Sequence, residues 1–277
     1  MISSLHNIAA RSDLLKELVI SELRRSVAGS KLGWLWWFFD PVLMMLVYWG
    51  IVAGLFGRGA DAYAPYPLFL FCALVTWKHF ATAVSRALTL LRGNERLIKS
   101  VAFPTVVLPL SVVFSGFVYF LAGFAMLLVA VLIWPSPHHS GGYWAVLQVV
   151  PLMAFQLAIT AGVCMAMSCY GALLQDLRLF VTHVLRVGFY LSPGLYGIDA
   201  IERKLASAVA APWGDLLYTA YMANPFALLI SGYREAVMFG AAVPWQWWLA
   251  LTAESALVLW GGYRIYQHHD RRVIKFL

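Results

Sequence analysis

The chain has 277 residues, of which 62% are hydrophobic and 12% are charged, and its formal net charge is +7. Soluble globular domains carry roughly 25% charged residues, so a water-soluble globule is excluded. The basic residues form short clusters between apolar runs rather than one stripe on a polar domain. This pattern argues against nucleic acid binding and is typical of membrane topology signals. The sequence therefore predicts an all-α integral membrane protein.

Residues 4–30 form the first predicted element, an amphipathic helix that is too polar to span a membrane. Its apolar residues recur at helical spacing and its polar residues fall largely on the other side: Leu14, Leu15, Leu18, Val19 and Leu23 against Lys16, Glu17, Ser21, Arg24 and Arg25. Such a helix is expected along the inner membrane surface. The alternative is a soluble helix that packs on a cytoplasmic partner. We therefore divide the chain into an interface helix, residues 1–32, and a transmembrane domain, residues 33–277.

Six apolar spans follow, because a helix needs about 20 apolar residues to cross a bilayer. They are expected at residues 33–56, 67–90, 105–134, 144–174, 180–196 and 245–266. The first begins where Arg24, Arg25 and Lys31 precede a group of tryptophans, an arrangement that marks the cytoplasmic face and its headgroup belt. It also contains a G-x-x-x-G motif, Gly50 and Gly54, which permits close approach of another helix of this chain or of a second subunit.

The stretch from residue 197 to residue 243 is mixed, with polar islands between short apolar pieces. None of these pieces is long enough to span. We expect two short re-entrant helices at the external mouth, separated near Pro212–Asp215, and we expect Asn224–Pro225 to begin the second. Arg234 and Glu235 would then need partners or a watery cavity at that depth.

The distribution of Lys and Arg outside the spans predicts that both termini are cytoplasmic. One side carries Arg11, Lys16, Arg24, Arg25, Lys31, Arg92, Arg96, Lys99, Arg178, Arg271, Arg272 and Lys275, and the other carries Arg58, Arg203, Lys204 and Arg234.

Lys78 and His79 stand near the middle of the second span, where charge is costly and normally faces a bundle interior or water. Lys78 must point inward and needs a carboxylate partner, a watery passage or a neutral state. Glu254 is the one acid well inside another span, so a Lys78–Glu254 pair is the structural expectation.

Catalytic and metal-binding motifs are missing from the sequence. It has no H-E-x-x-H, no G-x-S-x-G and no Walker A motif, and the spans hold no paired carboxylates. Cys72, Cys164 and Cys169 lie in apolar runs without a C-x-x-C pair, so we expect neither a disulfide framework nor a zinc site. The chain is therefore expected to be no enzyme, to hold no metal or other cofactor, and not to hydrolyse ATP by itself.

Five segments, in this order and spacing, carry a resemblance to a known family: GSKLGWLWWFFDP, VLMMLVYWGIV, LIKSVAFPTVVLPLS, FYLSPGLYG and NPFALLISGYREAVMFG. Together they resemble the ABC-2 permeases that export O-antigen, capsule and teichoic-acid polymers. The resemblance implies a homodimer of six-span subunits in the bacterial inner membrane, served by two separate nucleotide-binding subunits that bind ATP and Mg²⁺. It implies as substrate a polysaccharide carried on undecaprenyl diphosphate.

A sugar chain needs a wide, weakly binding passage, and aromatic rings suit such a lining. The residues expected to line it are Trp37, Phe38, Tyr48, Trp49, Lys78, Phe189, Tyr190 and Tyr196. Individually, many of these rings could instead contact lipid or pack in the core. Lys78 in this interpretation meets the lipid diphosphate or the sugar hydroxyls.

The loop after the second span is expected to couple the chain to its ATPase. Its candidate residues are Asn94, Glu95, Leu97, Ile98 and Lys99, with Leu97 and Ile98 seated in a groove of the partner. The alternative is a solvated loop whose basic residues only set topology. Two alternative functions are an intramembrane lipid-linked sugar transferase or polymerase, with Asp199, Glu202 and Arg203 as the only candidates, and an ABC-2 drug or lipid exporter subunit.

Overall fold

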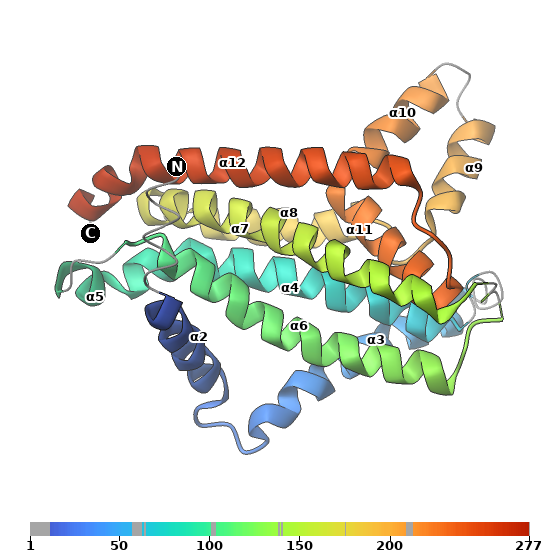
Figure 1. Ribbon diagram of the computed structural model, residues 1–277, viewed down its shortest axis with the longest axis horizontal. Helices are drawn as coiled ribbons and strands as arrows, with labels where there is room; N and C mark the ends of the chain where they lie inside the picture. Colours follow the sequence, from blue (N-terminus) through green and yellow to red (C-terminus); the bar gives the residue numbers. More distant parts are fainter. Residues whose placement is uncertain are drawn as a thin grey trace.

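The computed structural model describes residues 12–56, 63, 65–100, 104–137, 139, 141–174, 176–208 and 213–276, and within these ranges the chain is helical and contains no strand (Figure 1). The long helices are α3 (Trp36–Phe56), α4 (Tyr66–Gly93), α6 (Val107–Ile133), α7 (Val149–Leu173) and α12 (Trp245–Phe276). The shorter ones are α2 (Ser12–Val27), α5 (Glu95–Ser100), α8 (Leu177–Leu191), α9 (Ile198–Ala208), α10 (Trp213–Met222) and α11 (Pro225–Arg234).

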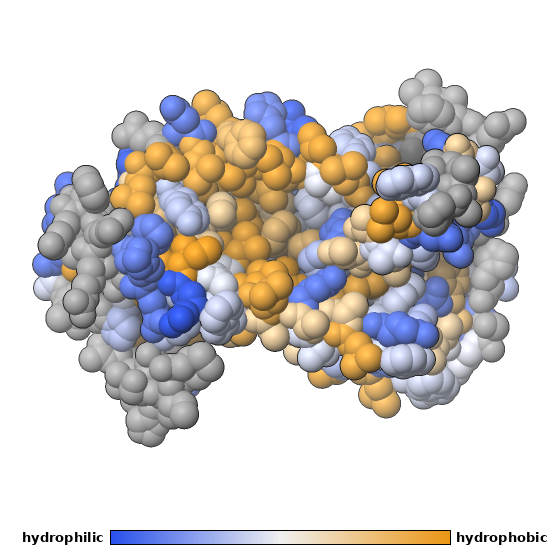
Figure 2. Space-filling view, turned by 90° about the horizontal axis from the view of Figure 1, so that it is seen from above, coloured by the Kyte–Doolittle hydropathy of each residue, from blue (hydrophilic) through white to orange (hydrophobic). Residues whose placement is uncertain are grey.

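Three helices of the described chain are long and apolar enough to cross a membrane: α4, α6 and the continuous stretch Tyr143–Leu173, which joins a 3-10 turn to α7. A further apolar helical run, Trp36–Ile51, is shorter. The chain is thus an all-α membrane protein, as its composition predicts. Figure 2 shows apolar residues over much of the middle of the visible face, as expected for a surface that meets lipid.

Helix α7 lies at the centre, between α4 on one side and α12 on the other, and α4 also packs on α3, α6, α8 and α11. Close approach depends on glycines. A Cβ on Gly262 of α12 would overlap the carbonyl oxygen of Gly162 on α7, and one on Gly171 would overlap that of Leu88 on α4. In contrast, Gly50 of the G-x-x-x-G motif has open space around it within the described chain.

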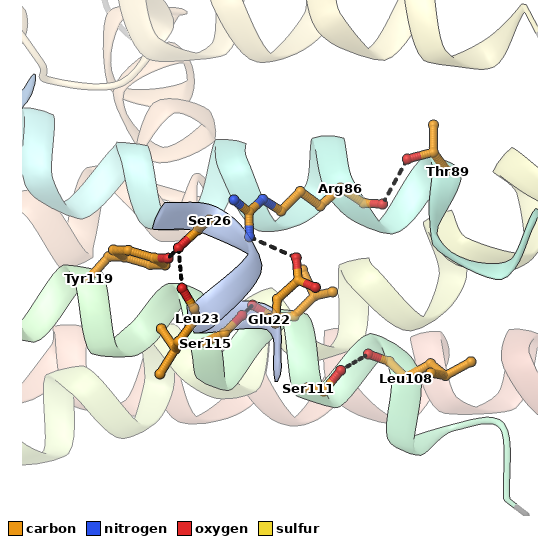
Figure 3. A network of polar contacts seen from close by, with 10 residues as sticks. Glu22, Leu23, Ser26, Arg86, Thr89, Leu108, Ser111, Ser115 and Tyr119 are labelled. Atoms are coloured by element: carbon orange, nitrogen blue, oxygen red, sulfur yellow. Dashed lines mark hydrogen bonds and ion pairs between the residues drawn. The ribbon is translucent and has the colours of Figure 1, made fainter. Parts of the chain in front are cut away.

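Helix α2 docks on α6 and α4, through both apolar and polar contacts (Figure 3). Leu18 packs on the cluster around Leu91. The Glu22 carboxylate accepts a hydrogen bond from Arg86 at 3.0 Å, and Ser26 pairs with Tyr119. The amphipathic helix predicted from sequence is therefore held by its own chain.

The stretch from 197 to 243 differs from the prediction, because it holds three short helices and a π-helical turn, Glu235–Phe239, instead of two helices. Helices α9 and α10 lie at one end of the molecule, outside the bundle of long helices, and α5 lies at the other end (Figure 1). Asn224 does begin a helix, since its side chain accepts a hydrogen bond from the Phe226 amide at 3.0 Å. That helix is α11, which is buried inside the bundle.

His79 belongs to a buried polar network that joins four helices. Its Nε2 lies 3.3 Å from the Val113 carbonyl, and its Nδ1 lies 2.9 Å from the Gln156 side-chain amide. The carbonyl can only accept, so Nε2 carries a proton, and the Gln156 amide N–H donates to Nδ1, so the ring is neutral. The Tyr233 hydroxyl then donates to Gln156 Oε1 at 2.8 Å. Each donor of this network thus meets an acceptor, and the network fixes the relative positions of α4, α6, α7 and α11.

The close contact between α7 and α12 generates a stability prediction with a matched control. Gly262→Ala would force a methyl into the Gly162 carbonyl, and overpacking of this kind costs about 1–3 kcal/mol. At neighbouring Gly261 an added Cβ would meet nothing within 4 Å, and alanine is the better helix former by about 1 kcal/mol. We expect thermal unfolding in detergent to shift down by several degrees for Gly262→Ala and not for Gly261→Ala. Equal melting temperatures would contradict this packing.

Candidate functional site

A groove of about 280 Å³ runs between α3, α4 and α8. Its walls combine three charged side chains with aromatic and apolar ones. They are Asp40, Pro41, Met44 and Tyr48 from α3, Leu74, Trp77, Lys78 and Ala81 from α4, and Arg186, Phe189 and Tyr190 from α8.

Helical periodicity explains why these residues meet. On each helix the lining positions recur every three or four residues, with one adjacent pair on each, so they form one stripe along one face. On α3 the stripe runs through Asp40, Met44 and Tyr48. Trp49, which follows Tyr48 directly, is turned away from the groove and is 41% exposed.

Lys78 forms a salt bridge with Asp40 across the groove wall. The pair predicted from sequence, Lys78 with Glu254, is therefore wrong. Helix α7 packs between α4 and α12 and separates the two residues. In the sequence Asp40 stands near the end of a span, but the start of α3 meets the middle of α4 and brings its carboxylate to Lys78. Oε2 of Glu254 is buried and has no hydrogen-bond partner within the described chain.

The aromatic side chains of the groove form a connected set around Phe189. The Phe189 ring centroid lies 5.9 Å from that of Tyr48, 6.1 Å from that of Trp77 and 5.6 Å from that of Tyr190. Phe189 itself is buried, whereas Tyr190 is 48% exposed. The groove thus offers flat apolar faces with polar edges beside an ion pair.

The structure brings four of the predicted lining residues together: Tyr48, Lys78, Phe189 and Tyr190. The other four do not line this groove, although Trp37 shares a neighbouring cavity with Lys78. Trp37 packs edge-on against Tyr119 at 4.3 Å and lines a cavity of about 480 Å³ between α2, α3, α4 and α6. Phe38 is exposed. Tyr196 lies in the turn after α8, where its hydroxyl donates to the Tyr190 carbonyl at 2.9 Å.

The sequence interpretation missed Asp40, Trp77 and Arg186. Helical spacing could have identified them, since each stands three or four positions from another residue that lines the groove.

The predicted coupling residues lie on or next to α5. Asn94 precedes the helix and donates to the Leu90 carbonyl at 2.9 Å, and Lys99 pairs with Glu95 at 2.6 Å. Leu97 and Ile98 pack against the cluster around Leu91 and Leu108, and this contact buries them partly. The outward face of α5 therefore carries Arg96 and Lys99, which are exposed.

Arg234 is buried, since only 2% of the residue is exposed, and it has the partners that the sequence analysis expects it to need at that depth. Its guanidinium donates five hydrogen bonds, all to backbone carbonyls. Nε and Nη2 reach Phe69, Nη1 reaches Pro193 and Tyr196, and Nη2 also reaches Gly194, at 2.6–3.3 Å. The guanidinium carbon of Arg234, Cζ, lies 3.3 Å from the Phe69 ring centroid. Arg234 thus ties α11 to α4 and to the turn that follows α8.

No family model matches the sequence. Comparison with curated proteins finds relatives over most of the chain. An O-antigen export system permease protein RfbA of Myxococcus xanthus is 27% identical over 271 residues, which cover 96% of each chain. An O-antigen export system permease protein RfbA of Klebsiella pneumoniae is 27% identical over 237 residues, which cover 85% of this chain and 84% of the relative.

The coupling between Asp40 and Lys78 can be measured by a double-mutant cycle. Lys78→Met leaves the Asp40 carboxylate unpaired, Asp40→Asn leaves the ammonium unpaired, and each single change should lower the melting temperature in detergent. The double variant should lose less than the two singles together, with an interaction free energy of about 1 kcal/mol or more. Lys78→Met combined with Glu254→Gln serves as the control and should be additive. Additivity in the Asp40 cycle would show that the pair contributes no coupling.

Proposed function

Because this chain belongs to the family of ABC-2 type O-antigen export permeases, we propose that it is the membrane subunit of an ATP-driven exporter that moves a lipid-linked polysaccharide across the bacterial inner membrane. The observation that carries the proposal is the similarity to such a permease over 96% of both chains. The absence of nucleotide-binding and catalytic motifs from the sequence agrees with a transport subunit. The substrate carrier in this proposal is undecaprenyl diphosphate.

In the proposed topology, α3, α4, α6, α7, α8 and α12 are the six spans. An even number of spans places both termini on one side, and the basic loops make that side the cytoplasm. Helix α2 then lies at the inner membrane surface. Helices α9 and α10, at the opposite end from α5, form the re-entrant lid of the external mouth.

The groove between α3, α4 and α8 is the proposed wall of the passage. Tyr48 and Tyr190 present rings with hydroxyl edges, which suit pyranose rings that slide past without tight binding. Lys78 and Arg186 add positive charge for the lipid diphosphate, and Asp40 offsets one of these charges. Gly50, which has open space around it in the described chain, leaves the first span open for a second copy of the subunit.

Coupling is proposed to run through α5 to two ATPase subunits, which bind ATP and Mg²⁺. Leu97 and Ile98 fix α5 to the end of the bundle, so force applied to α5 reaches α4 and α6 through the cluster around Leu91 and Leu108.

Deletion of the encoding gene tests the function directly. We expect surface polysaccharide to disappear and lipid-linked polymer to remain inside the cytoplasm, with recovery by the wild-type chain and not by the chain supplied with an ATPase-dead partner. A strain that displays normal surface polymer after deletion would reject the proposal. A strain without cytoplasmic polymer would point to a transferase or polymerase.

Charge reversal on the outward face of α5 tests coupling. Arg96→Glu with Lys99→Glu should leave the membrane level of the chain unchanged but weaken its assembly with the ATPase and reduce export several-fold. Lys204→Glu, an exposed reversal on α9 at the opposite end of the molecule, is the control. Full export by the α5 variant would remove α5 from the coupling path.

A further inference from the structure

A separate cavity of about 340 Å³ lies beneath α9, at the end of the molecule that carries the proposed lid. It is lined by Tyr63, Phe69, Gly197, Ile198, Asp199, Ser231, Arg234, Glu235 and Phe239. Four parts of the chain supply these residues: Tyr63 before α4, α4 itself, the segment at the start of α9, and α11 with its π-helical turn. Its volume falls at the small end of the roughly 300–1,000 Å³ that small-molecule sites occupy.

Two polar groups of this cavity have no partner within the described chain. Ser231 is 5% exposed, lines the cavity, and its buried hydroxyl makes no hydrogen bond. The Glu235 carboxylate lines the cavity as well and makes no salt bridge or hydrogen bond to the described residues. A buried hydroxyl without a partner costs about 1–3 kcal/mol. A ligand that supplies hydrogen bonds would remove this cost.

The opposite wall is pre-organised by Tyr63 and Asp199. The Tyr63 hydroxyl donates to Asp199 at 3.0 Å, and Arg203 pairs with the same carboxylate at 2.5 Å. Burial, followed by the nearby Asp199 carboxylate, raises the pKa of the Tyr63 hydroxyl, so this group keeps its proton. The Tyr63 ring stacks on Phe69 with centroids 4.5 Å apart. The carboxylate is thereby fixed in place, with an aromatic ring beside it.

Charge decides the class of ligand. Two acids, Asp199 and Glu235, stand in or at the cavity with two bases, Arg203 and Arg234, so their formal charges cancel. The five N–H groups of Arg234 are all engaged by carbonyls, and its fixed positive charge disfavours a metal cation. The groups left for hydrogen bonding to a ligand are the Glu235 carboxylate and the Ser231 hydroxyl, next to an aromatic ring. They suit a neutral molecule rich in hydroxyl groups.

The cavity is connected to the groove by one short segment. The Tyr196 carbonyl accepts from Arg234 on the cavity side, while the Tyr196 hydroxyl donates to the carbonyl of Tyr190, a groove residue. The other wall includes a π-helical turn, a distortion that occurs frequently at functional sites.

We propose that the cavity under α9 is a binding site for one sugar unit of the exported polysaccharide, held by Glu235 and Ser231. The site rests on the proposed function for its ligand. Its role is to hold the chain at the external mouth between steps of export, while α9 covers it.

Equilibrium binding to the purified full-length chain in lipid nanodiscs tests this site. The probe is a tritium-labelled oligosaccharide released by mild acid from the surface polymer of the same strain. Glu235→Gln, which replaces a charged acceptor by a neutral amide, and Ser231→Ala, which removes the hydroxyl, should each weaken binding about fivefold to tenfold. Ser207→Ala, which removes an exposed hydroxyl of α9 that bonds only to the Lys204 carbonyl, is the matched control and should bind as the wild type does.

Equal affinity of the wild type, Glu235→Gln and Ser231→Ala would overturn the site. So would the absence of binding by a wild-type chain that restores export in the deletion strain, and that result would leave the proposed function intact. Calcium or magnesium titration adds a second readout: a metal affinity that Glu235→Gln abolishes would identify a cation site and reject the sugar site. Melting temperatures of both variants within a few degrees of the wild type would show that the binding loss is local.

Discussion

The structure depends on how one buried cation is satisfied. Arg234 has no carboxylate partner among the described residues, and a guanidinium in such surroundings is tolerated only when each of its donors is bonded. The carbonyls of Pro193, Gly194 and Tyr196 lie just after α8 ends, where they have no helical partners. The cation and these carbonyls therefore satisfy one another. Lysine could not replace it, because three donors on a point charge cannot match five in a planar fork.

This arrangement sets the relation between the groove and the cavity under α9. The turn that Arg234 holds is joined to Tyr190 of the groove through the Tyr196 hydroxyl, and it leads into Gly197 and Asp199 of the cavity. The side chains of Arg234 and Tyr196 thus link the segment before α9 to the wall of the groove through hydrogen bonds to backbone carbonyls. The His79–Gln156–Tyr233 network and the glycine contacts of α7 hold the rest of the bundle together.

Several charged side chains of the described chain are paired locally. Asp40 lies beside Lys78, Glu22 beside Arg86, and Asp199 beside Arg203. In each case a carboxylate reaches a cation on a neighbouring element or one helical turn away. The Lys78–Asp40 pair stands on the groove wall, where both side chains remain partly exposed.

Hydropathy alone determined the class of protein and the approximate positions of the long helices, because these depend on local sequence. Tyr48, Lys78, Phe189 and Tyr190 could be found since each stands in an aromatic or anomalous position of an apolar run. The partner of Lys78, the burial of Arg234 and the third short helix before α12 were decided only by tertiary structure. Which carboxylate meets a lysine depends on where α3 crosses α4, and that crossing is set by packing between segments far apart in sequence. Whether an arginine faces water or five carbonyls likewise depends on which backbone groups the fold leaves unpaired around it.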